Sequence, residues 1–325
     1  MTQLIDILRA LADPTRLRIA ALLRVLELSV GEIAQILQQS QPRVSRHVRI
    51  LAEAELIERR KEGSWVFLRL RPDEQAKVVR DFLSDMPLSE VEKAIVAGDL
   101  AAMKSVQAQR AEAANQYFEE HAAEWDAIRS LHVAEAEVEQ AMLRLMHKRR
   151  LGHVLDIGTG TGRTAELFVP EARRVTALDR SPEMLRLARA RLTGKEWPVE
   201  LIQGDFYTLP LGDESADTVL LHQVLHYAQA PERVIAEAAR VMRPGGHILI
   251  VDFASHDREE LRAQAAHARL GFSDAQIRGW FASNGLLVEA GDALSGGELT
   301  VRLWLGRRRS DDSPMRTDEP QRTAA

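Results

Sequence analysis

Short runs of β-branched and aliphatic residues alternate with helical stretches over residues 151–305. This alternation is typical of a mostly parallel sheet flanked by helices. The runs expected to form strands are 151–157, 174–178, 199–203, 218–221, 247–253, 286–290 and 299–304. The pattern therefore predicts an α/β fold for this part of the chain.

Turn signals separate short helical patterns in the first part of the chain. Asp13 before Pro14 is typical of a helix start, because Asp caps the first backbone N–H groups and Pro fits the first turn. Ser29 and Glu32 have the spacing of a capping box, which opens another short helix. A turn leads from it to a helix over about 41–54, and two short helices joined by a tight turn indicate a helix-turn-helix.

The helix over about 41–54 has an apolar and a polar side. At 100° per residue, Val44, Val48 and Leu51 fall on one face. The polar side chains expected to contact DNA are Gln41, Arg43, Ser45, Arg46, His47 and Arg49. Arg pairs with guanine and Gln with adenine in the major groove. For this helix taken alone, a solvated basic face is the simpler interpretation.

Two strands, about 56–61 and 64–70, follow with a turn between them. Arg59, Arg60 and Lys61 are expected at the tip of this hairpin, where they can contact phosphates. A helix-turn-helix followed by a basic hairpin is a winged helix. The hairpin therefore favours DNA contact over a solvated face.

Residues 8–70 resemble the ArsR family of winged-helix repressors. The stretches that carry the resemblance are 11–17, 45–47 and 51–62. The resemblance implies a homodimer that binds an inverted repeat in double-stranded operator DNA. Its dimer interface would consist of helices over about 2–11 and 73–84.

One departure from the family pattern concerns metal sensing. Metal-sensing members carry two cysteines before the recognition helix, whereas the corresponding stretch 27–33 has none, and the whole chain lacks cysteine. Disulfides, thiolate zinc sites and arsenite sensing through that stretch are therefore excluded. No histidine lies between Asp73 and Glu90, so we expect no metal site in that helix and a regulator that senses something else.

A glycine-rich loop ends the first expected strand of the α/β region. Asp156 is followed by Gly158, Gly160 and Gly162, and glycines let a backbone turn tightly and approach a ligand closely. A dinucleotide-binding fingerprint would need glycine at the next position, which is Arg163. The loop has instead the pattern of an S-adenosylmethionine site.

A second acid, Asp179, ends the next expected strand and can accept both hydroxyls of a ribose. With this acid in place, residues 113–305 resemble the class I S-adenosylmethionine-dependent methyltransferases, and most closely the ubiquinone and menaquinone enzymes. The resemblance implies a Rossmann-like sheet of seven strands, one of them antiparallel. It assigns to S-adenosylmethionine, or to its demethylated product S-adenosylhomocysteine, Asp156, Gly158, Gly160, Gly162, Asp179, Asp205, Phe206, His222, Tyr117 and Trp125. For Tyr117 and Trp125, packing within helices is the alternative.

Methyl transfer from a sulfonium requires reactants held in line and water excluded, but no particular acid or base. If a base takes part, His222 and His226 are the first candidates, followed by His256 and His267. A structural or solvated role is the alternative for each histidine. The lack of cysteine argues against arsenite as the methyl acceptor, which the sequence does not name.

The length of 325 residues suggests about two domains. We expect a DNA-binding domain over 1–84, a helical connector and cofactor lid over 85–150, a methyltransferase domain over 151–306 and a disordered tail over 307–325.

Residues 1–80 hold 14 basic and 10 acidic side chains, whereas the whole chain holds 43 basic and 48 acidic side chains. This asymmetry fits a polyanion-binding module joined to an acidic one. Without a long apolar stretch or a signal sequence, we expect a cytoplasmic protein with no membrane partner.

Two functions are compatible with these patterns. The first is a transcriptional regulator whose methyltransferase domain binds S-adenosylmethionine or S-adenosylhomocysteine and thereby alters the affinity of the protein for DNA. The second is an active small-molecule methyltransferase whose winged helix controls its own operon.

Overall fold

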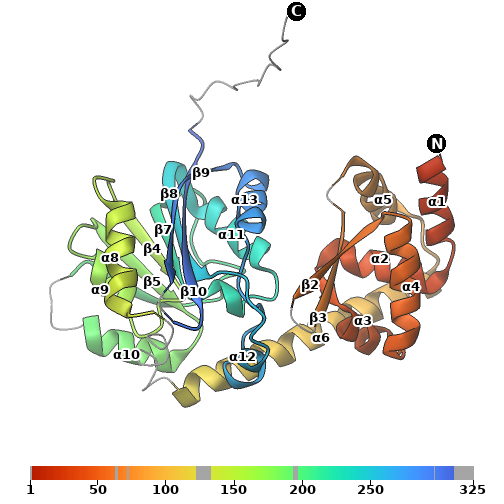
Figure 1. The fold of residues 1–325 in the computed structure, drawn as a ribbon, viewed down its shortest axis with the longest axis horizontal. Coiled ribbons are helices and arrows are strands. Elements are labelled where there is room, and N and C mark those ends of the chain that lie inside the picture. Colours follow the sequence, from red (N-terminus) through yellow and green to blue (C-terminus); the bar gives the residue numbers. More distant parts are fainter. Residues whose placement is uncertain are drawn as a thin grey trace, which may run out of the picture. The chain divides into compact units, whose positions relative to one another are not determined.

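The computed structural model describes residues 2–62, 65–71, 73–121, 133–192, 197–295 and 297–310. Contacts divide the chain into two compact units (Figure 1). The first unit consists of Met1–His121, His226–Pro231 and Ser255–Gly271, and the second of Ala122–Leu225, Glu232–Ala254 and Phe272–Ala325. Neither unit is one continuous stretch of chain, because the first includes two segments that lie between strands of the second.

The first unit contains the winged helix. Its helices are α1 (Thr2–Leu11), α2 (Pro14–Val25), α3 (Val30–Leu37), α4 (Gln41–Glu53), α5 (Glu74–Asp85) and α6 (Glu90–His121). Its strands are β1 (Leu28–Ser29), β2 (Ile57–Glu62) and β3 (Trp65–Leu70), in the order β1-β3-β2. The helix-turn-helix and the β-hairpin that the sequence predicts are both present.

Local capping explains where the helices of the winged helix begin. The Asp13 carboxylate accepts from the backbone N–H of Arg16 at 3.0 Å, which caps α2. Ser29 and Glu32 form the predicted capping box, with bonds of 2.7 and 3.2 Å. Strand β1 was not predicted, because two residues are too short to show a strand pattern. Its residues Leu28 and Ser29 pair with β3.

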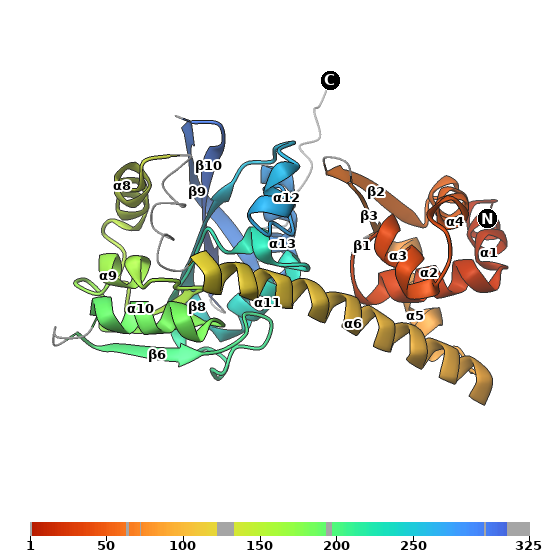
Figure 2. The ribbon, with the colours of Figure 1, turned by 90° about the horizontal axis from the view of Figure 1, so that it is seen from below.

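Helix α6 continues the first unit as one long helix (Figure 2). Its buried Asp99 accepts two hydrogen bonds from the Arg18 guanidinium of α2, at 2.6 and 2.7 Å. Met103 and Val106, one and two turns further on, are also buried. The contacts therefore group α6 with the winged helix rather than with the sheet.

The second unit is built on one seven-stranded sheet in the order β6-β5-β4-β7-β8-β10-β9. The strands are β4 (His153–Ile157), β5 (Arg174–Asp179), β6 (Val199–Gln203), β7 (Ala216–His222), β8 (Met242–Phe253), β9 (Leu286–Ser295) and β10 (Thr300–Arg308). Strand β10 is antiparallel to both neighbours, whereas the other pairs are parallel. The α/β fold with a seven-stranded, mostly parallel sheet is thus confirmed.

Helices cover both faces of this sheet. They are α8 (Glu135–Met146), α9 (Arg163–Phe168), α10 (Pro182–Leu192), α11 (Pro231–Val241) and α13 (Asp274–Ser283). The short helix α12 (Glu260–Gln264) belongs to the first unit instead. In Figure 1, α8, α9 and α10 lie on one face, and α11 and α13 on the other. Every residue of β4 is buried, as expected for a parallel strand covered on both sides.

Two strand boundaries differ from the prediction. Strand β8 begins at Met242 instead of His247, because it pairs with Ala216 and then shifts register past the glycines. The predicted start of the tail at residue 307 is too early, because Arg307 and Arg308 belong to β10. Arg307 pairs with both β8 and β9, and Arg308 pairs with β9. Residues 311–325 lie outside the described part of the chain. No helix of the described residues is long and apolar enough to cross a membrane.

Candidate functional site

The glycine loop after β4 has a backbone that only glycine adopts easily. Gly158, Gly160 and Gly162 all have positive φ, at 71°, 55° and 82°. A Cβ on Gly158 would lie 2.3 Å from Cγ2 of Val224, and one on Gly162 would lie 3.1 Å from Cα of Ala188. The loop is therefore held against the segment after β7 and against α10, with no room for side chains at these two positions.

Asp179 ties the loop to the end of β5. One carboxylate oxygen accepts from the Gly160 N–H at 2.8 Å, and the other accepts from the Ser181 N–H at 2.9 Å. Burial raises the pKa of Asp179, against the opposing effect of these backbone donors. The carboxylate thus lies beside the loop, as expected for two neighbouring parallel strands.

Two more acids complete this edge of the sheet. Asp156 is 1% exposed, and its Oδ2 accepts from the Thr159 hydroxyl at 2.6 Å. Asp205 follows β6, and its Oδ1 accepts from the Tyr207 N–H at 2.8 Å. Because β6, β5 and β4 are adjacent and parallel, Asp205, Asp179 and Asp156 all lie at the carboxyl edge of the sheet. Ligands of open α/β sheets bind at this edge.

The aromatic and histidine candidates do not all belong to the same unit of the chain. Phe206 is half-buried and meets the Tyr207 ring edge-on, with centroids 4.7 Å apart. His222 ends β7, is buried, and has its Nδ1 3.0 Å from the Thr164 hydroxyl of α9. His226 belongs to the first unit, where its ring lies 4.2 Å from the ring of His267. The two candidate bases therefore belong to different units.

The two predicted lid residues fall wholly or partly outside the described part of the chain. Tyr117 lies in α6, but its side chain is not described, and Trp125 lies outside the described residues. Their roles in covering a cofactor remain predictions.

The recognition helix α4 has the predicted division into faces. Val44, Val48 and Leu51 are buried. The polar residues Gln41, Arg43, Ser45, Arg46 and Arg49 are exposed. His47 differs: its side chain is 13% exposed and its Nδ1 lies 3.7 Å from the Asp13 carboxylate. His47 therefore packs at the start of α2, and DNA contact by the exposed set remains a prediction.

The basic residues of the hairpin lie in the half of β2 next to the turn, close to the predicted tip. Arg59 is exposed and pairs with Leu68, whereas the last described pair before the turn is Glu62 with Trp65. Arg60 and Lys61 also lie within β2, but their side chains are not described. Contact of these residues with phosphates remains a prediction.

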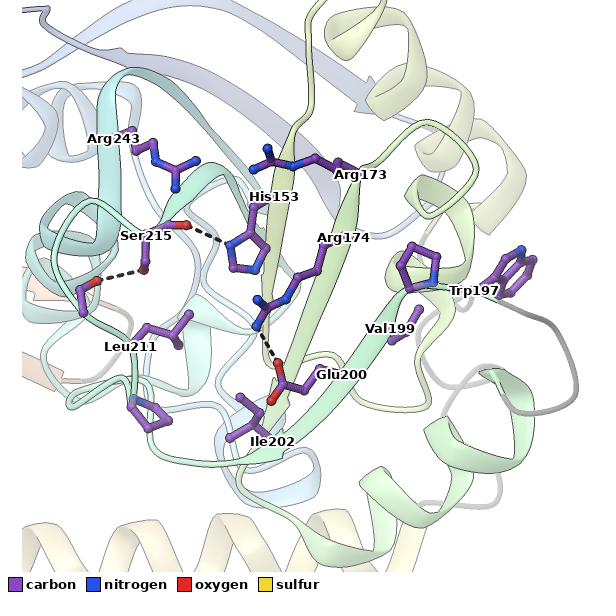
Figure 3. Close-up of a pocket in the computed structure, with 13 residues that line it drawn as sticks. His153, Arg173, Arg174, Trp197, Val199, Glu200, Ile202, Leu211, Ser215 and Arg243 are labelled. Atoms are coloured by element: carbon purple, nitrogen blue, oxygen red, sulfur yellow. Dashed lines mark hydrogen bonds and ion pairs between the residues drawn. The ribbon is translucent and has the colours of Figure 1, made fainter.

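A cavity of about 910 Å³ lies at the other edge of the sheet, at the amino ends of β4, β5 and β6 (Figure 3). No motif or pattern in the sequence marks it. Its Arg174 and Arg243 are 2.6 and 2.8 Å from the carboxylates of Glu200 and Asp217. Burial lowers the pKa of His153, whose ring contacts the Ser215 carbonyl at 2.8 Å. Both guanidinium groups are thus paired with carboxylates of the protein. The carboxyl edge of the sheet is therefore the stronger candidate for a ligand-binding site.

A winged helix and a methyltransferase-type sheet with an acidic carboxyl edge therefore define the two parts of the chain. Residues 13–59 match the bacterial regulatory protein, arsR family, and residues 155–250 match the methyltransferase domain family. Among the described residues, no three metal-ligating side chains come together. The chain thus holds one stretch that matches an arsR-type regulatory domain and another that matches a methyltransferase domain.

Curated relatives match the methyltransferase part. Phosphatidylethanolamine N-methyltransferase of Cereibacter sphaeroides is 40% identical over 116 residues, which is 35% of this chain and 57% of that protein. Demethylmenaquinone methyltransferase of Clavibacter sepedonicus is 34% identical over 102 residues, which is 31% of this chain and 41% of that protein. The matches thus span about half the length of these relatives.

A solved structure shares the fold. The N-methyltransferase NodS from Bradyrhizobium japonicum WM9, in complex with S-adenosylhomocysteine, superposes with a TM-score of 0.51 at 20% identity. The match covers 60% of this chain and 98% of that one. It shows that the second unit has a methyltransferase fold.

Proposed function

We propose that this chain is an S-adenosylmethionine-dependent methyltransferase whose arsR-type winged helix binds DNA. We further propose that S-adenosylmethionine and S-adenosylhomocysteine change its affinity for DNA by different amounts. The observation that carries the proposal is the hydrogen bond between Asp179 and Gly160, which joins an acid to the glycine loop at the carboxyl edge.

The residues at this edge fit the cofactor by their chemistry. A carboxylate has about four acceptor positions, and the Gly160 and Ser181 N–H groups occupy two of those of Asp179, at 2.8 and 2.9 Å. We assign the remaining capacity of Asp179 to the ribose hydroxyls. The glycine loop would hold the methionine part, with Asp156 near its ammonium group, and Asp205 and Phe206 would meet the adenine.

Bound S-adenosylmethionine would supply an electrophilic methyl group on its sulfonium. The contribution of the protein is then to hold that group in line with an acceptor and to exclude water. His222 would lie near the cofactor, since it ends β7, the strand next to β4. His222 and His226 remain the candidates for proton uptake, and the methyl acceptor stays open.

The exposed polar face of α4 supports DNA binding. Its guanidinium groups on Arg43, Arg46 and Arg49 suit base edges and phosphates. Exposed apolar side chains on α1 and α5 support the homodimer that the arsR resemblance implies; they are Ile5, Leu8, Val78 and Phe82. A dimer would present two α4 helices to the two halves of an inverted repeat.

The test is the affinity of the purified protein for its own upstream DNA at fixed salt, without ligand and with each cofactor form. Salt must be constant because phosphate contacts make affinity steeply salt-dependent. A different dissociation constant with each form supports a regulator that responds to the methylation state of its cofactor. Equal affinity in all three conditions contradicts this response, and would leave a methyltransferase whose winged helix acts on its operon independently of the cofactor.

A further inference from the structure

Two segments that depart from the methyltransferase sheet belong to the unit of the winged helix. The first, 226–231, begins within the short 3₁₀ helix Leu225–Tyr227, which follows shortly after β7. The second, 255–271, leaves after β8 and returns at α13. A bridge between Ala254 and Phe272 closes its base, so the excursion leaves and re-enters the sheet at one point. Both segments start at carboxyl ends of parallel strands.

Arg269 joins the two segments. Its backbone N–H donates to the His226 carbonyl at 2.9 Å, and its guanidinium donates to the Gln229 carbonyl. Its side chain is only 1% exposed. Burial of a charged guanidinium costs free energy unless polar partners replace the water that it loses. Arg269 is therefore held in one position.

The same guanidinium contacts the winged helix within the first unit. Its Nη2 lies 3.5 Å from a carboxylate oxygen of Glu27, which is 7% exposed. Its Cζ lies 4.2 Å from the centre of the Phe67 ring, in the geometry of a cation–π contact. The ion pair and the stacking contact come from one planar group, a combination that lysine does not reproduce.

Its two partners are attached to both DNA-binding elements. Glu27 directly precedes β1, in which Ser29 caps α3, the first helix of the helix-turn-helix. Phe67 lies in β3, opposite Ser29 on one side and Arg60 of the hairpin on the other. A shift of Arg269 would therefore displace residues that position both the helix-turn-helix and the wing.

We propose that Arg269 is the residue through which ligand occupancy at the carboxyl edge reaches the DNA-binding elements. This regulation rests on the proposed response of DNA affinity to the cofactor. His222 lies four residues before His226, and the Gln223 N–H donates to the Val251 carbonyl at 2.7 Å, which ties β7 to β8 near both departures. A ligand that orders the carboxyl edge of the sheet therefore changes the position of the first residues of segments 226–231 and 255–271, which Arg269 connects.

The test compares Arg269→Lys with wild type in two measurements. The first is the ratio of operator dissociation constants with S-adenosylmethionine and with S-adenosylhomocysteine. A coupling of about 5–150-fold, typical of linked sites, should fall to within about twofold in the variant, with cofactor affinity in the absence of DNA retained. Arg278→Lys, on an exposed side chain of α13, is the matched control and should keep the wild-type ratio.

The second measurement is hydrogen exchange over residues 26–33 and 65–70. Adding S-adenosylhomocysteine should change exchange there in wild type but not in Arg269→Lys. If that variant does not fold, Phe67→Leu, which removes the ring but keeps an apolar side chain, takes its place. Wild-type coupling that survives in the folded variants overturns the role of Arg269 alone. A wild type without coupling overturns the cofactor response and the role of Arg269 together.

Discussion

Replacement of Asp179 by Ala tests the placement of the cofactor most directly. The carboxylate lies beside the glycine loop and accepts from Gly160 and Ser181 at 2.8 and 2.9 Å. In the proposed complex it also accepts from two ribose hydroxyls. A hydrogen bond to a charged group contributes about 1.5–3 kcal/mol. Loss of both should therefore weaken cofactor binding by about 3–6 kcal/mol, or roughly 10²–10⁴-fold in the dissociation constant.

The same substitution should change stability much less. The raised pKa of Asp179 indicates that burial of the charge costs free energy in the unliganded protein. Alanine removes that cost and also removes the acceptor of two backbone N–H groups. The two effects oppose each other, so we expect the free energy of unfolding to change by only about 1–2 kcal/mol.

Calorimetric titration with S-adenosylhomocysteine near neutral pH measures the first effect, and urea unfolding of the full chain measures the second. Asp213→Ala is the control, because Asp213 is an exposed acid of the same unit that pairs with Arg240. A folded Asp179→Ala protein that binds the ligand within about threefold of wild type would show that the ribose does not meet this carboxylate.

Three further predictions concern DNA binding, stability and pH. Arg46→Ala should weaken operator binding by about 1–3 kcal/mol in a filter or anisotropy assay and leave cofactor affinity intact; unchanged DNA affinity would contradict the predicted face of α4. Asp99→Asn should lower the free energy of unfolding by about 1–3 kcal/mol, because Arg18 loses its buried carboxylate; an effect below about 0.5 kcal/mol, the level of an exposed pair, would refute this reasoning. Burial holds the pKa of His153 below its ordinary value of 6.5, so the unfolded chain takes up a proton there before the folded protein does. Stability should therefore fall as the pH drops below 6.5, and His153→Gln should reduce that slope in urea titrations; an identical slope would assign the loss to other groups.

The sequence predicts the elements of both units well where a pattern repeats. The faces of α4 follow from the spacing of Val44, Val48 and Leu51, and burial of these residues agrees with it. The capping box of Ser29 and Glu32 and the glycine loop are likewise local signals, and each occurs where the spacing places it. The seven-stranded sheet follows from the alternation of apolar runs and helical stretches.

Features that depend on distant pairing could not be predicted. Strand β1 exists only because Leu28 and Ser29 meet β3. Arg269 lies more than two hundred positions from Glu27 in the sequence. No periodicity or motif marks Arg269. It becomes visible only through its burial and its partners.

The position of β10 in the sheet has a consequence for synthesis of the chain. This strand lies between β8 and β9, and its residues Val301, Leu303 and Leu305 are fully buried. Until the ribosome has released residues 300–308, β8 has an unpaired edge and β9 has no place in the sheet. Unpaired edges invite association with other chains. The helices α1 to α5 precede the sheet in the chain and can form before this stage. The methyltransferase sheet is therefore expected to be the late and aggregation-sensitive step of biogenesis.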